Sequence, residues 1–123
     1  MAITAARYDM RIQDNATWED AFQLGTVGDT TWSFTGQNFR CDVKGSRDDA
    51  SPLLTAQTSN GTIVVDDAVA RVLHFFVPET SIAAALLPGD YVYDLVMFDG
   101  STPPIRVVLM RGRIKVSHGI TVG

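Results

Sequence analysis

Hydrophobic and polar residues alternate with a period of two along much of the chain, which is typical of β-strands that bury one face. The clearest case is residues 38–44, where Phe39, Cys41 and Val43 alternate with polar or charged side chains. Turn-forming Gly, Pro, Asn and Asp residues separate the alternating stretches. The pattern predicts strands at residues 7–13, 18–24, 31–34, 38–44, 53–58, 62–66, 71–77, 91–98 and 105–116.

Two hairpins are predicted in the first half of the chain. A polar turn joins residues 7–13 to residues 18–24, so we expect these two strands to pair. Asn60-Gly61 separates residues 53–58 from residues 62–66, and an Asn-Gly pair between β-prone segments is a strong hairpin signal. Both hairpins are expected to bury one face.

The last third of the chain predicts a third hairpin. Residues 91–98 and 105–116 flank a turn at 99–104 that contains two prolines, which cannot donate to a β-ladder. Both faces of residues 91–98 carry apolar side chains, as expected of a central strand. Gly112 interrupts the last apolar run, and we expect it to mark a bulge or bend.

One short helix is predicted at residues 80–87. Thr80 is a suitable N-cap, a run of Ala, Ile and Leu follows, and Pro88-Gly89 ends the helix. Residues 45–52 have no periodicity and many turn-forming residues, and we expect them to form a mobile loop. The helix at residues 80–87 is the only one that the sequence predicts.

The fold class that follows is an all-β sandwich in a single domain. The chain has 123 residues, close to the commonest domain size, and 46% of them are hydrophobic. Short strands at this spacing favour two packed sheets over other β architectures. We expect one domain over residues 1–123, with a short N-terminal arm at 1–6 and a C-terminal tail at 117–123.

Charge and cysteine content limit the kinds of partner and the cellular compartment that we expect. The net charge is -4, and the ten Lys and Arg are scattered singly along the sequence, so we expect no nucleic-acid partner. No apolar run is long enough to predict an export signal or a membrane span. Cys41 has no second cysteine to pair with, which fits synthesis in a reducing compartment.

No catalytic, cofactor-binding or metal-binding site is predicted. His74 lies in an apolar strand, where a half-buried structural role is expected, and His118 lies in the tail, where we expect exposure to solvent. The sequence contains no nucleophile-elbow, phosphate-loop or zinc-ligand motif. We therefore expect no enzymatic activity.

Carboxylates occur in pairs at Asp48-Asp49 and Asp66-Asp67, but without the staggered spacing of a calcium loop. We interpret them as solvated loop residues. Asp94 differs because it lies within a predicted central strand. It is expected to pair with Arg106 or Arg111 across the last hairpin.

Four aromatic residues leave a binding alternative open. Trp18, Trp32, Tyr91 and Tyr93 each lie where a sandwich core needs bulk, but together they can also line a sugar-binding face. Burial of all four would remove the carbohydrate-binding interpretation, and exposure on one outer face would support it.

Short motifs along most of the chain resemble a family of tailed-phage structural proteins. The motifs are T-W-S-F-T-G at residues 31–36, the Asn60-Gly61 turn, T-x-I-x-x-x-L at 80–86, P-G-D-Y-V-Y-D-L at 88–95 and G-R-I-K-V-S-x-G-I-T at 112–121. In this order they are similar to the N-terminal domain of phage upper baseplate proteins and to tail-fibre attachment domains.

The resemblance implies an immunoglobulin-like antiparallel β-sandwich in a virion, made in the host bacterial cytoplasm. Gly89-Asp90-Tyr91 is similar to the turn before a tyrosine-corner strand, whose phenol bonds back to nearby backbone. Such proteins often continue into a long fibre. Because this chain ends at Gly123, we expect a stand-alone tail, baseplate or tail-fibre adaptor, with a capsid decoration protein as the alternative.

The partners that the resemblance implies are other virion proteins, and we expect a homo-oligomer or ring in the assembled particle. Edge strands of an open sandwich offer unpaired backbone groups to a partner. The segments expected to make contacts are the arm at residues 1–6, the loop at 45–52 and the tail at 117–123.

Overall fold

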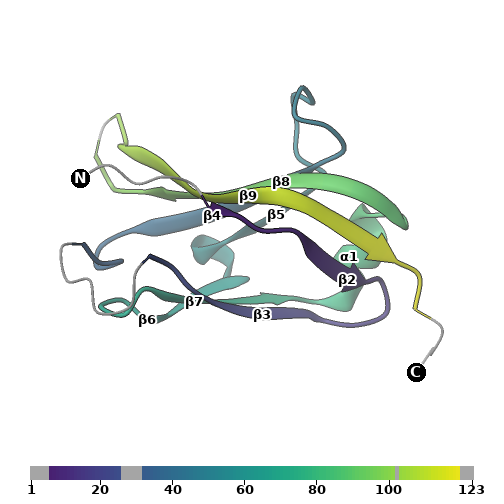
Figure 1. Ribbon diagram of the computed structural model, residues 1–123, viewed down its shortest axis with the longest axis horizontal. Coiled ribbons are helices and arrows are strands. Elements are labelled where there is room, and N and C mark those ends of the chain that lie inside the picture. Colours follow the sequence, from purple (N-terminus) through teal and green to yellow (C-terminus); the bar gives the residue numbers. More distant parts are fainter. Residues whose placement is uncertain (1–5, 26–31, 102, 120–123) are drawn as a thin grey trace.

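The computed structural model describes residues 6–25, 32–101 and 103–119, and in these residues two β-sheets pack face to face (Figure 1). The predicted all-β sandwich with one short helix is thereby confirmed. Most of the predicted arm at 1–6 and part of the tail at 117–123 lie outside the described residues.

The six-stranded sheet, called the large sheet below, has the strand order β1-β9-β8-β4-β5, and β2 also pairs with β9. The three-stranded small sheet has the order β3-β7-β6. The strands of the large sheet are β1 (Ala6–Arg7), β2 (Met10–Gln13), β4 (Asn38–Lys44), β5 (Leu54–Gln57), β8 (Gly89–Phe98) and β9 (Arg106–Ser117). Those of the small sheet are β3 (Trp18–Gln23), β6 (Ile63–Asp67) and β7 (Val72–Val77).

The core lies between the two sheets. Phe39, Cys41 and Val43 project into it from β4, which confirms the alternation predicted for residues 38–44. Leu73 and Phe75 of β7 face them from the small sheet and are also fully buried. Side chains on the opposite side of each strand point outward, so the sandwich has two outer faces.

The first predicted hairpin is wrong. β2 pairs in parallel with β9, whereas β3 pairs antiparallel with β7 in the other sheet. The turn between them therefore carries the chain across the edge of the sandwich. Ile12 and Trp18 are both buried, from opposite walls of the core. Alternation showed that each strand buries one face but not which strand it pairs with.

The Asn-Gly hairpin is wrong for a related reason. β5 pairs with β4 and β6 pairs with β7, so the chain changes sheets between them through the 3₁₀ turn η1 (Thr58–Asn60). Gly61 has a φ of 79°, the left-handed conformation that an Asn-Gly step favours. The Thr62 hydroxyl accepts a hydrogen bond from the Gln57 amide at 2.9 Å, which closes the turn.

The strand predicted at residues 31–34 is also wrong where it is described, because Trp32, Ser33 and Phe34 belong to no strand. Thr31 lies outside the described residues. Phe34 is buried and its amide donates to the Ala68 carbonyl at 2.9 Å. This irregular segment therefore packs against the core, and its aromatic side chains contact the core although the segment forms no strand.

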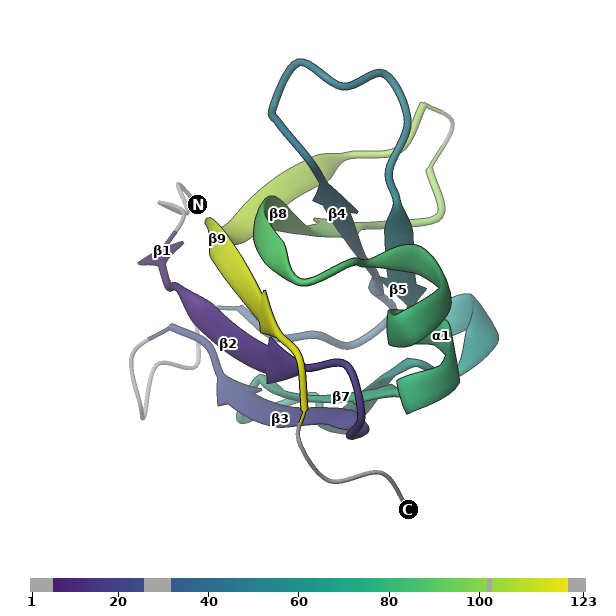
Figure 2. The same cartoon turned by 90° about the vertical axis from the view of Figure 1, so that its right-hand side faces the viewer.

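Helix α1 (Glu79–Ala85) is confirmed, with different ends. Its N-cap is Pro78 rather than Thr80, and Leu86 caps its C-terminus before Pro88-Gly89 is reached. The helix lies beside β5 (Figure 2). Among the described residues, no helix is long and apolar enough to cross a membrane.

The hairpin of β8 and β9 is confirmed, but the bulge is not at Gly112. The register shifts between Leu95 and Val96, opposite Leu109, whereas Gly112 lies in regular register with Tyr93. A Cβ atom at Gly112 would collide with the Tyr8 carbonyl. Gly112 is therefore required by the close crossing of the N-terminal segment.

Candidate interaction surface

The outward-facing positions of the large sheet form a surface called here the basic face. Cross-strand register places Asp42, Asp94, Arg111 and Arg7 in one row across β4, β8, β9 and β1. All Lys and Arg of the chain except Arg71 lie on this face or, as Arg47, in the adjoining β4–β5 loop. The members on the strands are Arg7, Arg11, Arg40, Lys44, Arg106, Arg111, Arg113 and Lys115.

Among the described residues, most of these positive charges have no ion-pair or hydrogen-bond partner. Arg40 bonds Asp42 at 2.9 Å, Arg7 lies 3.9 Å from Asp9, and Arg106 lies over the Phe98 ring. In the described part of the chain, the other basic residues make no ion pair and no side-chain hydrogen bond. They are Arg11, Lys44, Arg47, Arg111, Arg113 and Lys115.

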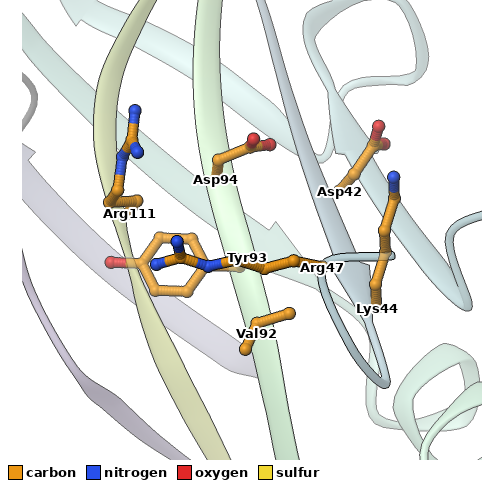
Figure 3. A pocket seen from close by; sticks show the side chains of 7 residues that line it. All are labelled: Asp42, Lys44, Arg47, Val92, Tyr93, Asp94 and Arg111. Atoms are coloured by element: carbon orange, nitrogen blue, oxygen red, sulfur yellow. The ribbon is translucent and has the colours of Figure 1, made fainter. Parts of the chain in front are cut away.

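A hollow of about 190 Å³ lies in the middle of the basic face (Figure 3). Asp42, Asp94 and Arg111 project from three neighbouring strands, and Arg47 extends from the β4–β5 loop across β8 toward β9. Residues 45–52 form a loop, as predicted, whereas the mobility expected of it stays a prediction. The loop is mostly exposed and projects from the sandwich in Figure 2. It thus supplies one wall of the hollow.

A second hollow of about 230 Å³ adjoins the first and shares Arg47, Val92 and Arg111 with it. We call it the arginine hollow because Arg7 and Arg113 complete its lining together with Gly112. Its described lining residues include no carboxylate. Guanidinium groups bind carboxylates and phosphates in a bidentate manner. The arrangement can therefore bind anionic groups of a partner.

Carboxylates are interleaved with the basic residues. Asp42 also accepts a hydrogen bond from the Thr55 hydroxyl at 2.8 Å, and Asp94 lies between Asp42 and Arg111 in the ladder. The register opposite Arg111 agrees with the sequence prediction for Asp94. The predicted cross-strand neighbours are therefore confirmed, although among the described ion pairs none joins Asp94 to Arg111 or Arg106.

The outward-facing positions of the small sheet form the opposite surface, called here the acidic face. His74 is half-buried on β7, as predicted, and its two ring nitrogens lie 3.3 Å from Glu19 and 3.0 Å from Asp66. Those two carboxylate partners were not foreseen. The described residues of this face include no Lys or Arg. Its members are Glu19, Ala21, Gln23, Val64, Asp66, Val72, His74 and Phe76.

The described polar contacts of both histidine rings are with carboxylates, not with a hydroxyl or thiol that could act as a nucleophile. The described contacts of His74 are Glu19, Asp66 and the Phe76 ring, none of which is a hydroxyl or thiol. His118 is exposed, as predicted, but its Nδ1 lies 2.8 Å from Asp14. The Gly119 amide and His118 both hydrogen-bond to Asp14 and lower its pKa.

One aspartate of each predicted pair stabilises a local turn. Asp49 accepts hydrogen bonds from the Ser46 amide and hydroxyl, and Asp67 accepts from the amides of Val69 and Ala70. Within the described residues, no group of His, Cys, Asp and Glu is arranged to hold a metal ion. Turn chemistry therefore explains Asp49 and Asp67, whereas Asp66 contacts His74.

The four aromatic residues do not form an outer platform. Trp18 and Tyr93 are buried, whereas Trp32 and Tyr91 are half-buried and pack against the core. The Tyr93 hydroxyl donates to the Tyr8 carbonyl, and that of Tyr91 donates to the Leu87 carbonyl. The second bond is the one expected of a tyrosine corner.

No protein-family model matches the chain, and no curated protein matches it. The resemblance to tailed-phage proteins therefore stays a prediction from motifs.

Proposed function

We propose that this protein is a non-enzymatic structural subunit of a tailed-phage virion, a tail, baseplate or tail-fibre adaptor that binds other virion proteins. The observation that carries the proposal is the basic face. An acidic chain places nearly all its basic residues on one sheet surface, and most of these have no partner among the residues that the structure describes. Unpaired charge concentrated on one face favours docking of a complementary partner.

The strand order supports the structural relation to phage sandwich domains. We infer an immunoglobulin-like topology in which β3, β7 and β6 correspond to strands B, E and D, and β4, β8 and β9 to C, F and G. The bond from Tyr91, at the start of β8, to Leu87 supports the same assignment. These features were implied by the resemblance and are consistent with it.

An acidic protein surface fits the basic face better than nucleic acid does. Asp42, Asp90 and Asp94 occupy outward positions among the basic residues and would repel phosphates. Apolar Val96 and Phe98 lie on the same face. Interfaces between proteins combine apolar residues, Arg and matched charges in this way. The scatter of basic residues along the sequence does not itself exclude nucleic acid, because the fold gathers them.

The proposal predicts that the chain is a component of the particle. Mass spectrometry of purified virions that carry the gene, with tails separated from capsids, is expected to find the protein in the tail fraction. Recovery in the capsid fraction would instead support the decoration alternative. Absence from both fractions would contradict a virion role.

The docking surface is tested by an Arg111→Glu variant, which reverses one charge in the middle of the basic face. We expect roughly tenfold less incorporation into particles, as is typical for a central interface charge. Ala83→Glu combined with Ala84→Glu on the exposed side of α1 makes the same change in net charge and is the matched control. Equal incorporation of both variants would argue against docking through the basic face.

A further inference from the structure

We propose that the protein self-associates head to tail, with the basic face of one copy seated on the acidic face of the next. The inference rests on the proposed assembly role and names a second copy of this chain as one partner. It goes beyond the expectation of a ring or homo-oligomer because it assigns the two surfaces that meet.

Charge complementarity between the two outer faces is the first argument. Glu19 and Asp66 flank His74 on the acidic face, and the described residues there include no Lys or Arg. Arg111 and Arg113 on the basic face have no internal partner in the described chain. These two arginines are therefore available to pair with the carboxylates of another copy, whose partner within their own chain is His74.

Exposed apolar side chains give the second argument. On the acidic face, Phe76 is 38% exposed and Val64 is 40% exposed. On the other side of the molecule, Phe98 and Val96 lie at outward positions of β8, and nearby Ile105 is 66% exposed. Each face therefore combines charge with apolar surface that contact with another copy would remove from water.

The placement of the faces determines the geometry. They belong to different sheets and point in opposite directions from the sandwich (Figure 1). A two-fold dimer would bring each face against itself and would oppose like charges. Contact between unlike faces is heterologous, so the copy at each end of an assembly keeps one free face to which another copy can add. The assembly therefore grows into an open row, or into a ring if the rotation between copies closes.

The size of the acidic face determines how strongly two copies are expected to associate. Three strands about 4.8 Å apart, with strands of up to about six residues, give a flat area of roughly 300 Å². A standard interface buries about 800 Å² on each partner. Association should thus be weak in dilute solution and become effective where several contacts close a ring or a scaffold aligns the copies.

Sedimentation velocity on the intact chain tests the inference over a concentration series up to about 1 mM, a range suited to small interfaces. The average mass is expected to rise with concentration at low salt. Increasing the salt from about 50 mM to about 500 mM shortens the screening length and should weaken association roughly tenfold. A monomer at every concentration and at low salt would overturn the inference.

Reversing one charge on each face tests whether these two faces meet in the assembly. Arg111→Glu and Glu19→Lys should each weaken association about tenfold, and the two substitutions together in one chain should restore at least part of it. Glu79→Lys on α1 is the matched control for Glu19→Lys, and the Ala83→Glu, Ala84→Glu pair is the control for Arg111→Glu. Thermal unfolding of each variant verifies that it is folded.

Two results would contradict the assigned faces: association unaffected by either reversal, or a combined variant no better than the weaker single one. The outcome is distinguishable from that of the virion experiment. A monomeric chain that still enters particles would remove self-association and leave the adaptor role standing.

Discussion

Arg71 shows how one residue acquires a role from the fold alone. It is 1% exposed and has a φ of 62°, which is uncommon for a residue other than glycine. Its guanidinium donates to the carbonyls of Leu24 at 2.8 Å and Trp32 at 3.1 Å and lies over the Trp32 ring. It therefore ties the segments after β3 and before β4 to the β6–β7 hairpin.

Replacing Arg71 with Met should lower the free energy of unfolding by about 3 kcal/mol, because buried carbonyls would lose a charged donor. Arg71→Lys should recover only part of the loss, since an ammonium group cannot reproduce the planar geometry. Urea denaturation measures both. Arg11→Met, at an exposed position, is the control and should change stability by less than about 0.5 kcal/mol. A similarly small loss for Arg71→Met would refute this role.

At the scale of elements, the N-terminal edge of the large sheet depends on Gly112. β1 and β2 both run parallel to β9 and are separated by Tyr8 and Asp9. The interruption follows from contacts with β9 and β8: Asp9 accepts a hydrogen bond from the Arg113 amide, and the Tyr8 carbonyl accepts one from Tyr93. The sequence predicted one continuous strand because it could not show this crossing.

Gly112→Ala should destabilise the protein by about 1 to 3 kcal/mol, the usual cost of forcing a methyl group into a packed site. The new Cβ would displace the Tyr8 carbonyl and weaken its bond with Tyr93. Chemical denaturation gives the stability. Gly100→Ala is the control because its Cβ would have open space. Equal effects of the two substitutions would exclude the close-crossing explanation.

The end of β9 is fastened to the β2–β3 turn by Asp14, which bonds the Gly119 amide at 2.9 Å and His118. These bonds lower the pKa of Asp14 below its ordinary value of 3.8. A lowered carboxyl pKa contributes stability that is present above the ordinary value and is lost as pH falls through the folded-state pKa.

We therefore expect Asp14→Asn to be less stable than the wild type at pH 7, with the difference narrowing once pH falls below 3.8. Thermal unfolding at a series of pH values measures this convergence. Asp48→Asn, in the exposed β4–β5 loop, should show no such dependence. A difference that stays constant between neutral and acidic pH would show that the carboxylate charge is not the cause.

For the whole molecule, the main feature is the separation of charge between two outer faces. Arg40 and Lys44 alternate with the core residues of β4, and Arg111, Arg113 and Lys115 do the same on β9. Alternation therefore predicted that each points outward. It could not show that the two sets share one face, because that depends on the register of β8 between them.

The sequence by itself determined what short-range patterns control: most of the strands, the short helix, the last hairpin, the 45–52 loop and the burial of Cys41. Periodicity and turn chemistry act over a few residues, so these predictions needed no partner. Only the tertiary structure decided which strands pair, because two half-buried strands fit either sheet equally well. The same pairing brings dispersed arginines together on the basic face, and the proposed docking surface consequently depends on long-range register.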